Sequence, residues 1–181
     1  MRVIAGKYKG YKIEEPILTT TRITKERARE GLFSALDREL RDKKVLDLFA
    51  GSGSLGFEAL SRGASSITLV DQNDLCIKCM MKTQQNLKVS QNEVNIVKGI
   101  YPNVIFLLDS PFDIIFLDPP YGKFDFDEMI ENLLETKIIL NKTTIIVEDI
   151  KPFISKRFVF EKTKSYKYGL TNVTVLTNVQ E

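Results

Sequence analysis

Residues 45–56 carry the first pattern with chemical meaning, because a short apolar run containing Asp47 passes into glycines spaced G-x-G-x-x-G. A good helix former follows over residues 57–62, and a glycine ends it. Strand, tight glycine turn and helix form the first unit of a nucleotide-cofactor-binding α/β fold. Gly51 and Gly53 lack a Cβ atom, so the backbone there can turn sharply and approach a ligand closely.

Two acids beside this turn indicate which cofactor it serves. Asp47 precedes the glycines, where its carboxylate would repel the pyrophosphate of a dinucleotide but attract the amine and sulfonium of S-adenosylmethionine. Asp71 ends the next apolar run about twenty residues beyond the first glycine, where an acid accepts hydrogen bonds from ribose hydroxyls. Taken singly, the two acids are also explained as a turn carboxylate and a helix N-cap. We assign Phe49 and Gln72 to the same predicted cofactor site.

Residues 112–117 form a second apolar run, which leads into Asp118-Pro119-Pro120-Tyr121. In open α/β sheets the ligand lies beyond the carboxyl ends of the strands, so this segment is predicted to emerge beside the glycine turn. The two prolines stiffen the turn and remove two N–H donors, which leaves an acceptor-only site suited to an exocyclic amino group. We predict that Asp118, Pro119, Pro120 and Tyr121 are catalytic, with the tyrosine ring stacking on a base, and that Asp118 also contacts the cofactor.

The rest of the chain supplies the elements that position these residues. After residue 44, apolar runs alternate with helical segments, which predicts parallel strands joined by crossover helices. Two final runs have no clear helix between them and are predicted to pair antiparallel at an edge of the sheet. This α/β arrangement, mostly parallel with an antiparallel C-terminal edge, resembles the Rossmann-like sheet of class I S-adenosylmethionine-dependent methyltransferases. The predicted strands are 45–48, 67–70, 94–97, 114–117, 144–147, 158–160 and 172–176.

The segment before the sheet is predicted to form a β-hairpin followed by a helix. Residues 1–20 would be a basic hairpin extension, residues 21–181 the methyltransferase domain, and the helix would run from Thr24 to Arg41. Cations interleaved with Tyr8 and Tyr11 suit phosphates and unstacked bases. An isolated hairpin is only marginally stable, so it is expected to be mobile until a partner binds. The alternative is an ordinary edge hairpin of the sheet.

Charge is distributed unevenly along the chain, although the formal net charge is only +2. Both flanks of a mildly acidic centre are basic, which indicates a polyanion-binding surface built by the two ends of the chain. The alternative is a solvated basic face. The net charge is +5 over residues 1–44, −7 over residues 45–150 and +4 over residues 151–181.

Composition excludes several classes of protein. A chain of 181 residues is expected to be one domain, and it has no apolar run long enough to span a membrane and no apolar signal-peptide core, so a cytoplasmic location is expected. The absence of histidine excludes serine–histidine hydrolases and histidine-ligated metals. Cys76 and Cys79 are the only cysteines, too few for a closed zinc site, so no metal is expected. We interpret them as buried thiols of a helix over residues 74–87; a redox pair is the alternative.

The Asp-Pro-Pro-Tyr turn, together with the glycine turn after Asp47, resembles the amino-group methyltransferases that use S-adenosylmethionine. Further segments resemble the RsmD family over nearly the whole chain. The chain departs from the family pattern at Ile23, where a proline is usual, and at Lys98-Gly99-Ile100-Tyr101, where an acid often holds the adenine. The segments that carry the resemblance are RVIAGKYKG (2–10), TRITKERAREGLF (21–33), VLDLFAGSG (45–53), FLDPPY (116–121) and Tyr168-Gly169.

This resemblance implies methyl transfer from S-adenosylmethionine to the exocyclic N2 of one guanine in small-subunit ribosomal RNA, within an assembling ribosomal particle. The reaction would be a direct displacement, in which Asp118 and the Pro119 carbonyl hold the amine and Asp118 is a candidate to take its proton. The rival functions are methylation of adenine N6 or cytosine N4, a catalytically silent assembly factor, and a nicotinamide-dependent oxidoreductase. The predicted RNA-binding residues are Arg2, Lys7, Lys9, Arg22, Lys25 and Arg27.

Overall fold

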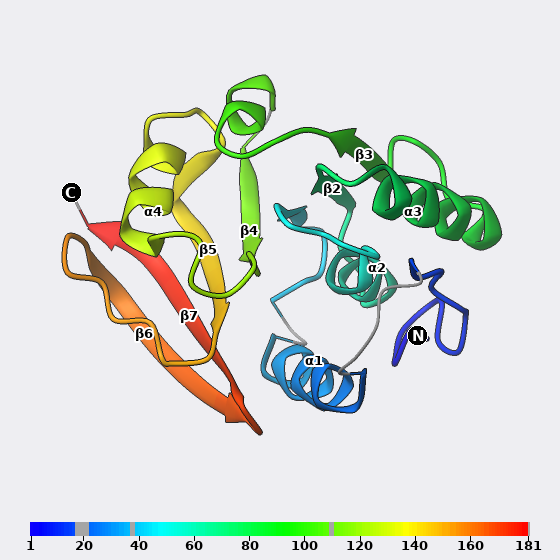
Figure 1. Ribbon diagram of the computed structural model, residues 1–181, viewed down its shortest axis with the longest axis horizontal. Coiled ribbons are helices and arrows are strands. Elements are labelled where there is room, and N and C mark those ends of the chain that lie inside the picture. The colour runs from blue at the N-terminus through cyan, green and yellow to red at the C-terminus, as the bar shows by residue number, and fades with distance from the viewer. Residues whose placement is uncertain (17–21, 37–38, 109–110, 181) are drawn as a thin grey trace.

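A computed structural model describes residues 1–16, 22–36, 39–108 and 111–180, with the side chains of all of these except 22–27 and 141. Helices and strands alternate through the centre of the chain, and the last two strands follow one another directly (Figure 1). The elements are α1 (Arg22–Leu36), β1 (Lys44–Asp47), α2 (Ser54–Ser61), β2 (Ser66–Asp71), α3 (Asp74–Leu87), β3 (Val94–Lys98), η1 (Asn103–Leu107), β4 (Phe112–Leu117), α4 (Phe126–Leu134), β5 (Ile139–Asp149), β6 (Val159–Tyr168) and β7 (Thr171–Gln180).

The strands form one seven-stranded sheet in the order β3-β2-β1-β4-β5-β7-β6. The first five strands are parallel, β7 is antiparallel to β5, and β6 is antiparallel to β7 at the edge. The predicted class I methyltransferase architecture is therefore confirmed. Since the chain leaves β1 toward β2 on one side and returns as β4 on the other, the carboxyl ends of β1 and β4 flank the point where a ligand crevice is expected.

Both faces of the sheet are covered, as expected for parallel strands. Neighbouring residues of β1 point to opposite faces: Val45 packs in a core with α1, α2 and α3, whereas Leu46 packs in a core with η1 and α4. Figure 1 shows the same two layers of helices on either side of the central strands. Helix α2 lies very close to the sheet, because a Cβ atom on Gly56 would come within 2.2 Å of Leu69 Cδ2.

The N-terminal extension corrects one expectation. Its two arms pair through the isolated antiparallel bridge between Arg2 and Lys12 and through a hydrogen bond from Gly10 N to Val3 O, without forming regular strands, and it is not an edge of the sheet. Instead it packs on helices, with Val3, Tyr8 and Ile13 buried in the same core as α1, α2 and α3. The extension is therefore anchored rather than loosely attached. The predicted domain boundary at residue 20 lies outside the described residues.

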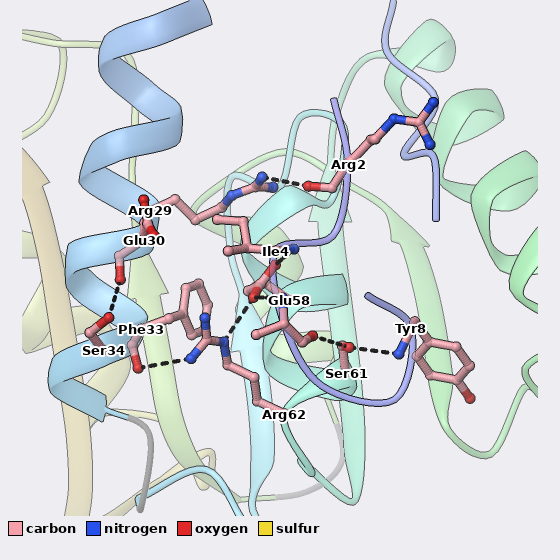
Figure 2. A network of polar contacts seen from close by, with 11 residues as sticks. Arg2, Ile4, Tyr8, Arg29, Glu30, Phe33, Ser34, Glu58, Ser61 and Arg62 are labelled. Atoms are coloured by element: carbon pink, nitrogen blue, oxygen red, sulfur yellow. Dashed lines mark hydrogen bonds and ion pairs between the residues drawn. The ribbon is translucent and has the colours of Figure 1, made fainter. Parts of the chain in front are cut away.

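Polar contacts fix this extension to α2 (Figure 2). The amides of Ile4 and Ala5 donate to the two carboxylate oxygens of Glu58 at 2.7 and 3.1 Å, and the Tyr8 amide donates to Ser61 Oγ at 2.9 Å. Glu58 is fully buried and also accepts from Arg62 Nε at 2.8 Å. One buried carboxylate therefore satisfies backbone donors that would otherwise be unpaired.

Several element boundaries differ from the sequence prediction. Helix α1 ends at Leu36 rather than Arg41, and the chain continues with turn bonds such as Lys43 N to Leu40 O. Strands β6 and β7 are much longer than the predicted runs. The prediction relied on apolar residues, whereas most β6 side chains are exposed and polar, so much of this strand was missed. Such a strand is held by its backbone pairing with β7, which hydropathy does not record. Among the described residues, no helix is both long and apolar enough for a membrane span.

We predict that Glu58→Ala lowers the free energy of unfolding by about 3–5 kcal/mol, because it leaves buried amide donors and the Arg62 contact without their carboxylate. Urea denaturation followed by circular dichroism measures this loss. Glu135→Ala, at an exposed position, is the control and should change stability by less than about 0.5 kcal/mol. Equal losses in the two variants would contradict the anchoring role of Glu58.

Candidate active site

A cavity of about 770 Å³ lies at the carboxyl ends of β1, β2, β4 and β5. Its size is in the range of small-molecule and cofactor sites. Two of the predicted cofactor residues, Asp47 and Gly53, are buried and do not line the cavity. The predicted residues that do line it are Phe49, Gly51, Asp71, Gln72, Asp118, Pro119, Pro120 and Tyr121.

The glycine turn has the left-handed backbone that its sequence predicts. Gly51 has a φ of 55° and Gly53 a φ of 77°, values that side chains with a Cβ atom rarely adopt. A Cβ atom on Gly51 would meet nothing within 4 Å, so space remains open on the cavity side. A Cβ atom on Gly53 would lie 2.8 Å from the Phe57 ring, so this glycine allows α2 to start directly under the turn.

Asp71 connects the loops that follow three strands. Its Oδ2 accepts from the Gly51 amide at 2.8 Å, its Oδ1 accepts from the Asn73 amide at 2.8 Å, and its backbone carbonyl accepts from the Gly99 amide at 3.1 Å. A carboxylate oxygen has two acceptor sites, so each oxygen can accept a further hydrogen bond. Asp71 therefore positions the glycine turn and can still bind a hydroxyl in the cavity.

Asp47 is only 1 % exposed. Its Oδ2 accepts from the Gly56 amide at 3.2 Å, whereas its Oδ1 has no hydrogen-bond partner among the described residues. Burial raises the pKa of Asp47 to about 7; the Gly56 hydrogen bond opposes this rise, and the negative charges of Asp71 and Glu148 add to it. The Asp47 carboxyl therefore contacts the start of α2 through Gly56 and does not line the cavity. Its part in cofactor binding stays a prediction.

The Asp-Pro-Pro-Tyr turn continues directly from β4 into the cavity. Pro119 is buried, and Tyr121 is 42 % exposed, so its ring is accessible from solvent. The Lys123 amide donates to the Pro120 carbonyl at 3.3 Å and closes the turn. Burial raises the pKa of the Tyr121 phenol, and the negative charge of Glu148 adds to this rise. The turn thus presents acceptors and one aromatic ring in a negatively charged environment.

Comparisons with known proteins agree with this geometry. The family model described as "Conserved hypothetical protein 95" matches residues 1–177. The chain belongs to this family, the RsmD family. The protein named ribosomal RNA small subunit methyltransferase D from Escherichia coli (strain K12) is 33% identical over 148 residues, which cover 82% of this chain and 74% of the relative. The protein of the same name from Buchnera aphidicola subsp. Acyrthosiphon pisum is 38% identical over 150 residues, 80% of this chain and 74% of the relative.

A solved structure described as "Putative methyltransferase yhhF from Escherichia coli" has the same fold, with a TM-score of 0.83 and 27% sequence identity. The match covers 100% of this chain and 99% of that chain. The resemblance seen in the motifs is therefore confirmed at the level of family and fold.

An aromatic wall of the cavity was not predicted. Phe49, Tyr101 and Phe124 contact one another with ring centroids 5.4 to 5.8 Å apart, and all three line the cavity. Asn132 Nδ2 donates to the Tyr101 hydroxyl at 2.8 Å and fixes that ring. Tyr101 follows β3, at the end of the segment Lys98-Gly99-Ile100-Tyr101, which contains no acid. The rings come from three separate loops, so only their shared place at the sheet edge brings them together.

The extension and α1 also reach the cavity. Met1, Glu15 and Pro16 line it together with Arg29 of α1. Arg29 is almost fully buried, and its Nη2 donates to the Arg2 carbonyl at 2.7 Å. The first residues of the chain are therefore part of the cavity wall.

Three of the predicted RNA-binding residues, Arg2, Lys7 and Lys9, are exposed on the extension. Arg2 Nη1 donates to the Gly10 carbonyl at 2.7 Å, and Lys7 Nζ lies 4.9 Å from the centre of the Tyr8 ring. The other three, Arg22, Lys25 and Arg27, lie on α1, and their side chains are outside the described residues.

The cysteine pair lies on α3, as predicted, and both thiols are free. Cys76 is buried and lines the cavity, and burial raises its pKa to about 11; burial also raises the pKa of Cys79. Reactive redox thiols need a lowered pKa, so the raised pKa values argue against a redox pair. The interpretation as buried thiols holds for Cys76, whereas Cys79 is only partly buried.

We predict that Asp47→Asn abolishes a pH dependence of stability. The pKa of Asp47 is raised from 3.8 in the unfolded chain to about 7 in the fold. The contribution of this group to the free energy of unfolding is therefore greatest below pH 4 and falls as the pH rises to 7. The asparagine keeps an acceptor for the Gly56 amide. Its stability relative to wild type should therefore rise between pH 4 and pH 8, by a few kcal/mol at about 1.4 kcal/mol per pKa unit.

Urea denaturation of both proteins at pH 5 and pH 8 makes this measurement. Glu135→Gln, an exposed change, should follow the wild-type profile. Parallel profiles for wild type and Asp47→Asn would show that the Asp47 carboxyl does not titrate in this range.

Proposed function

We propose that this protein transfers a methyl group from S-adenosylmethionine to the exocyclic N2 of a guanine in small-subunit ribosomal RNA. The observation that carries the proposal is that one cavity holds both the glycine turn positioned by Asp71 and the acceptor-only Asp-Pro-Pro-Tyr turn. The names of the RsmD relatives support ribosomal RNA as the substrate class.

The donor set of the cavity fits a cationic nucleoside cofactor. Asp71 has acceptor capacity for ribose hydroxyls, the space above Gly51 is open, and the Phe49–Tyr101–Phe124 wall offers flat surfaces for adenine. Asp47 Oδ1 has no hydrogen-bond partner in the described parts of the chain, and a positive charge nearby would favour the ionised form of this carboxyl. When bound, S-adenosylmethionine supplies a methyl group that is already electrophilic because it is attached to a sulfonium.

The chain itself then positions the nucleophile. Asp118 and the Pro119 carbonyl accept hydrogen bonds from the amine, so that its lone pair is directed toward the methyl carbon. With S-adenosylmethionine bound, attack by the amine nitrogen would break the carbon–sulfur bond and leave S-adenosylhomocysteine, and Asp118 would take the proton that the amine loses. Positioning of two reactants accounts for up to about 7–11 kcal/mol of barrier lowering. A base in helical RNA must first leave its stack, and the half-exposed Tyr121 ring can stack on it.

The extension is the proposed RNA contact, within an assembling small subunit in the cytoplasm. Its exposed cations suit phosphates. Because Val3 and Tyr8 belong to the core, deletion of the extension would damage the fold. Substitution of Lys7 and Lys9 is the cleaner way to test RNA contact.

The proposal is tested by incubating the protein with labelled S-adenosylmethionine and small subunits that lack the modification, followed by nucleoside analysis. Labelled N2-methylguanosine is the expected product. Labelled N6-methyladenosine or N4-methylcytidine would replace the guanine assignment, and binding without transfer would identify a silent assembly factor.

We predict that Asp71→Ala weakens S-adenosylmethionine binding about 10- to 100-fold, since it removes charge-assisted hydrogen bonds of about 1.5–3 kcal/mol each and releases the Gly51 amide. Isothermal titration calorimetry measures the dissociation constant. Asp74→Ala, at an exposed acid outside the cavity, is the matched control. Unchanged affinity in Asp71→Ala would remove this residue from the cofactor site.

We predict that Asp118→Ala lowers kcat by at least about 100-fold while the cofactor dissociation constant changes far less, because its main partner is the substrate amine. Single-turnover methyl transfer and calorimetry separate the two effects. Near wild-type transfer by this variant would show that the amine is not held by Asp118.

A further inference from the structure

A second carboxylate, Glu148, stands beside Asp118 in the same cavity. Leu117 of β4 pairs with Val147 of β5, so Asp118 and Glu148 occupy the next position on neighbouring parallel strands, which lie about 5 Å apart. Both are two residues beyond side chains of the same core, Phe116 and Ile146, so both project to the same face of the sheet. Glu148 is 9 % exposed, yet it lines the cavity.

The order of the strands places Glu148 on the substrate side. The glycine turn and Asp71 follow β1 and β2, which lie to one side of β4, whereas Glu148 ends β5 on the other side. Asp118 at the end of β4 stands between them. A base whose amine is held at Asp118 therefore extends toward β5, away from the cofactor residues.

The amine-holding turn cannot by itself choose the base, because guanine, adenine and cytosine all carry an exocyclic amine. The ring nitrogen beside that amine differs: guanine N1 carries a hydrogen, whereas adenine N1 and cytosine N3 carry lone pairs. An acceptor next to Asp118 would bind the guanine N1–H and repel the lone pair of the other two bases.

The Asp-Pro-Pro-Tyr turn beside Glu148 lacks two backbone donors that could instead serve adenine or cytosine. Pro119 and Pro120 have no N–H. A carboxylate has about four acceptor sites, so Glu148 can accept from a base while keeping another contact.

We propose that Glu148 accepts the N1–H of the target guanine and thereby sets the base specificity of the enzyme, an inference that rests on the proposed function above. Asp118 and the Pro119 carbonyl take the N2 hydrogens, and Glu148 takes the neighbouring one. A flipped base is thus recognised on its Watson–Crick edge by acceptors alone.

The test uses particles in which 2-aminopurine replaces the target guanine, once labelling has located that nucleotide. This base keeps the N2 amine but has a lone pair at N1. Wild type should prefer guanine in kcat/KM by about 10- to 100-fold, the factor of one charge-assisted hydrogen bond. In Glu148→Gln the amide can donate to N1, so the ratio of guanine to 2-aminopurine should fall by a similar factor, with cofactor affinity unchanged.

Comparing the ratio between two proteins cancels the intrinsic reactivity of each base. Asp149→Asn is the matched control, because the Asp149 carboxylate neighbours Glu148 in the chain but does not line the cavity. This variant should keep the wild-type ratio. The inference is overturned if wild type uses both bases equally, or if Glu148→Gln slows both without changing the ratio. Wild-type N2-methylguanosine formation with either result would leave the proposed function intact, whereas no guanine methylation by wild type would refute both.

Discussion

Four carboxyl groups crowd the end of one sheet, and the rest of the site depends on how their charge is compensated. Asp47, Asp71, Asp118 and Glu148 stand at or just after the ends of β1, β2, β4 and β5, which are neighbours in the sheet. Parallel pairing makes this unavoidable, because the carboxyl ends of all four strands meet at one edge. Negative charge concentrated there favours a ligand that brings a cation and hydrogen-bond donors.

The chain compensates these groups unequally. Asp71 receives two backbone amides, Gly51 and Asn73, and so is paired before any ligand binds. Within the part of the chain that the structure describes, Asp47 receives only the Gly56 amide, and its burial raises its pKa toward neutrality. The same edge therefore contains one carboxylate that organises the loops and one that is buried with its pKa raised to about 7.

The anchoring of the N-terminal extension solves a different problem, which is how to hold an irregular segment of chain. Glu58 and Ser61 of α2 satisfy its backbone amides, and Val3 and Ile13 place its apolar side chains in the core. Through the hydrogen bond from Arg29 to the Arg2 carbonyl, the same segment is joined to α1 at the cavity wall. The surface proposed for RNA and the cavity proposed for chemistry thus belong to one packed unit.

The sequence by itself determined the local units of this protein. The glycine turn and the Asp-Pro-Pro-Tyr turn depend on the backbone freedom of glycine and the stiffness of proline, and the alternation of apolar runs with helical segments predicts parallel strands; these are properties of neighbouring residues. Only the tertiary structure decided that Glu148 stands beside Asp118, that Phe49, Tyr101 and Phe124 share one wall, and that Asp47 is buried behind its turn. These facts depend on strand order and register between segments far apart in the chain, and hydropathy and spacing carry no information about which partner each strand finds.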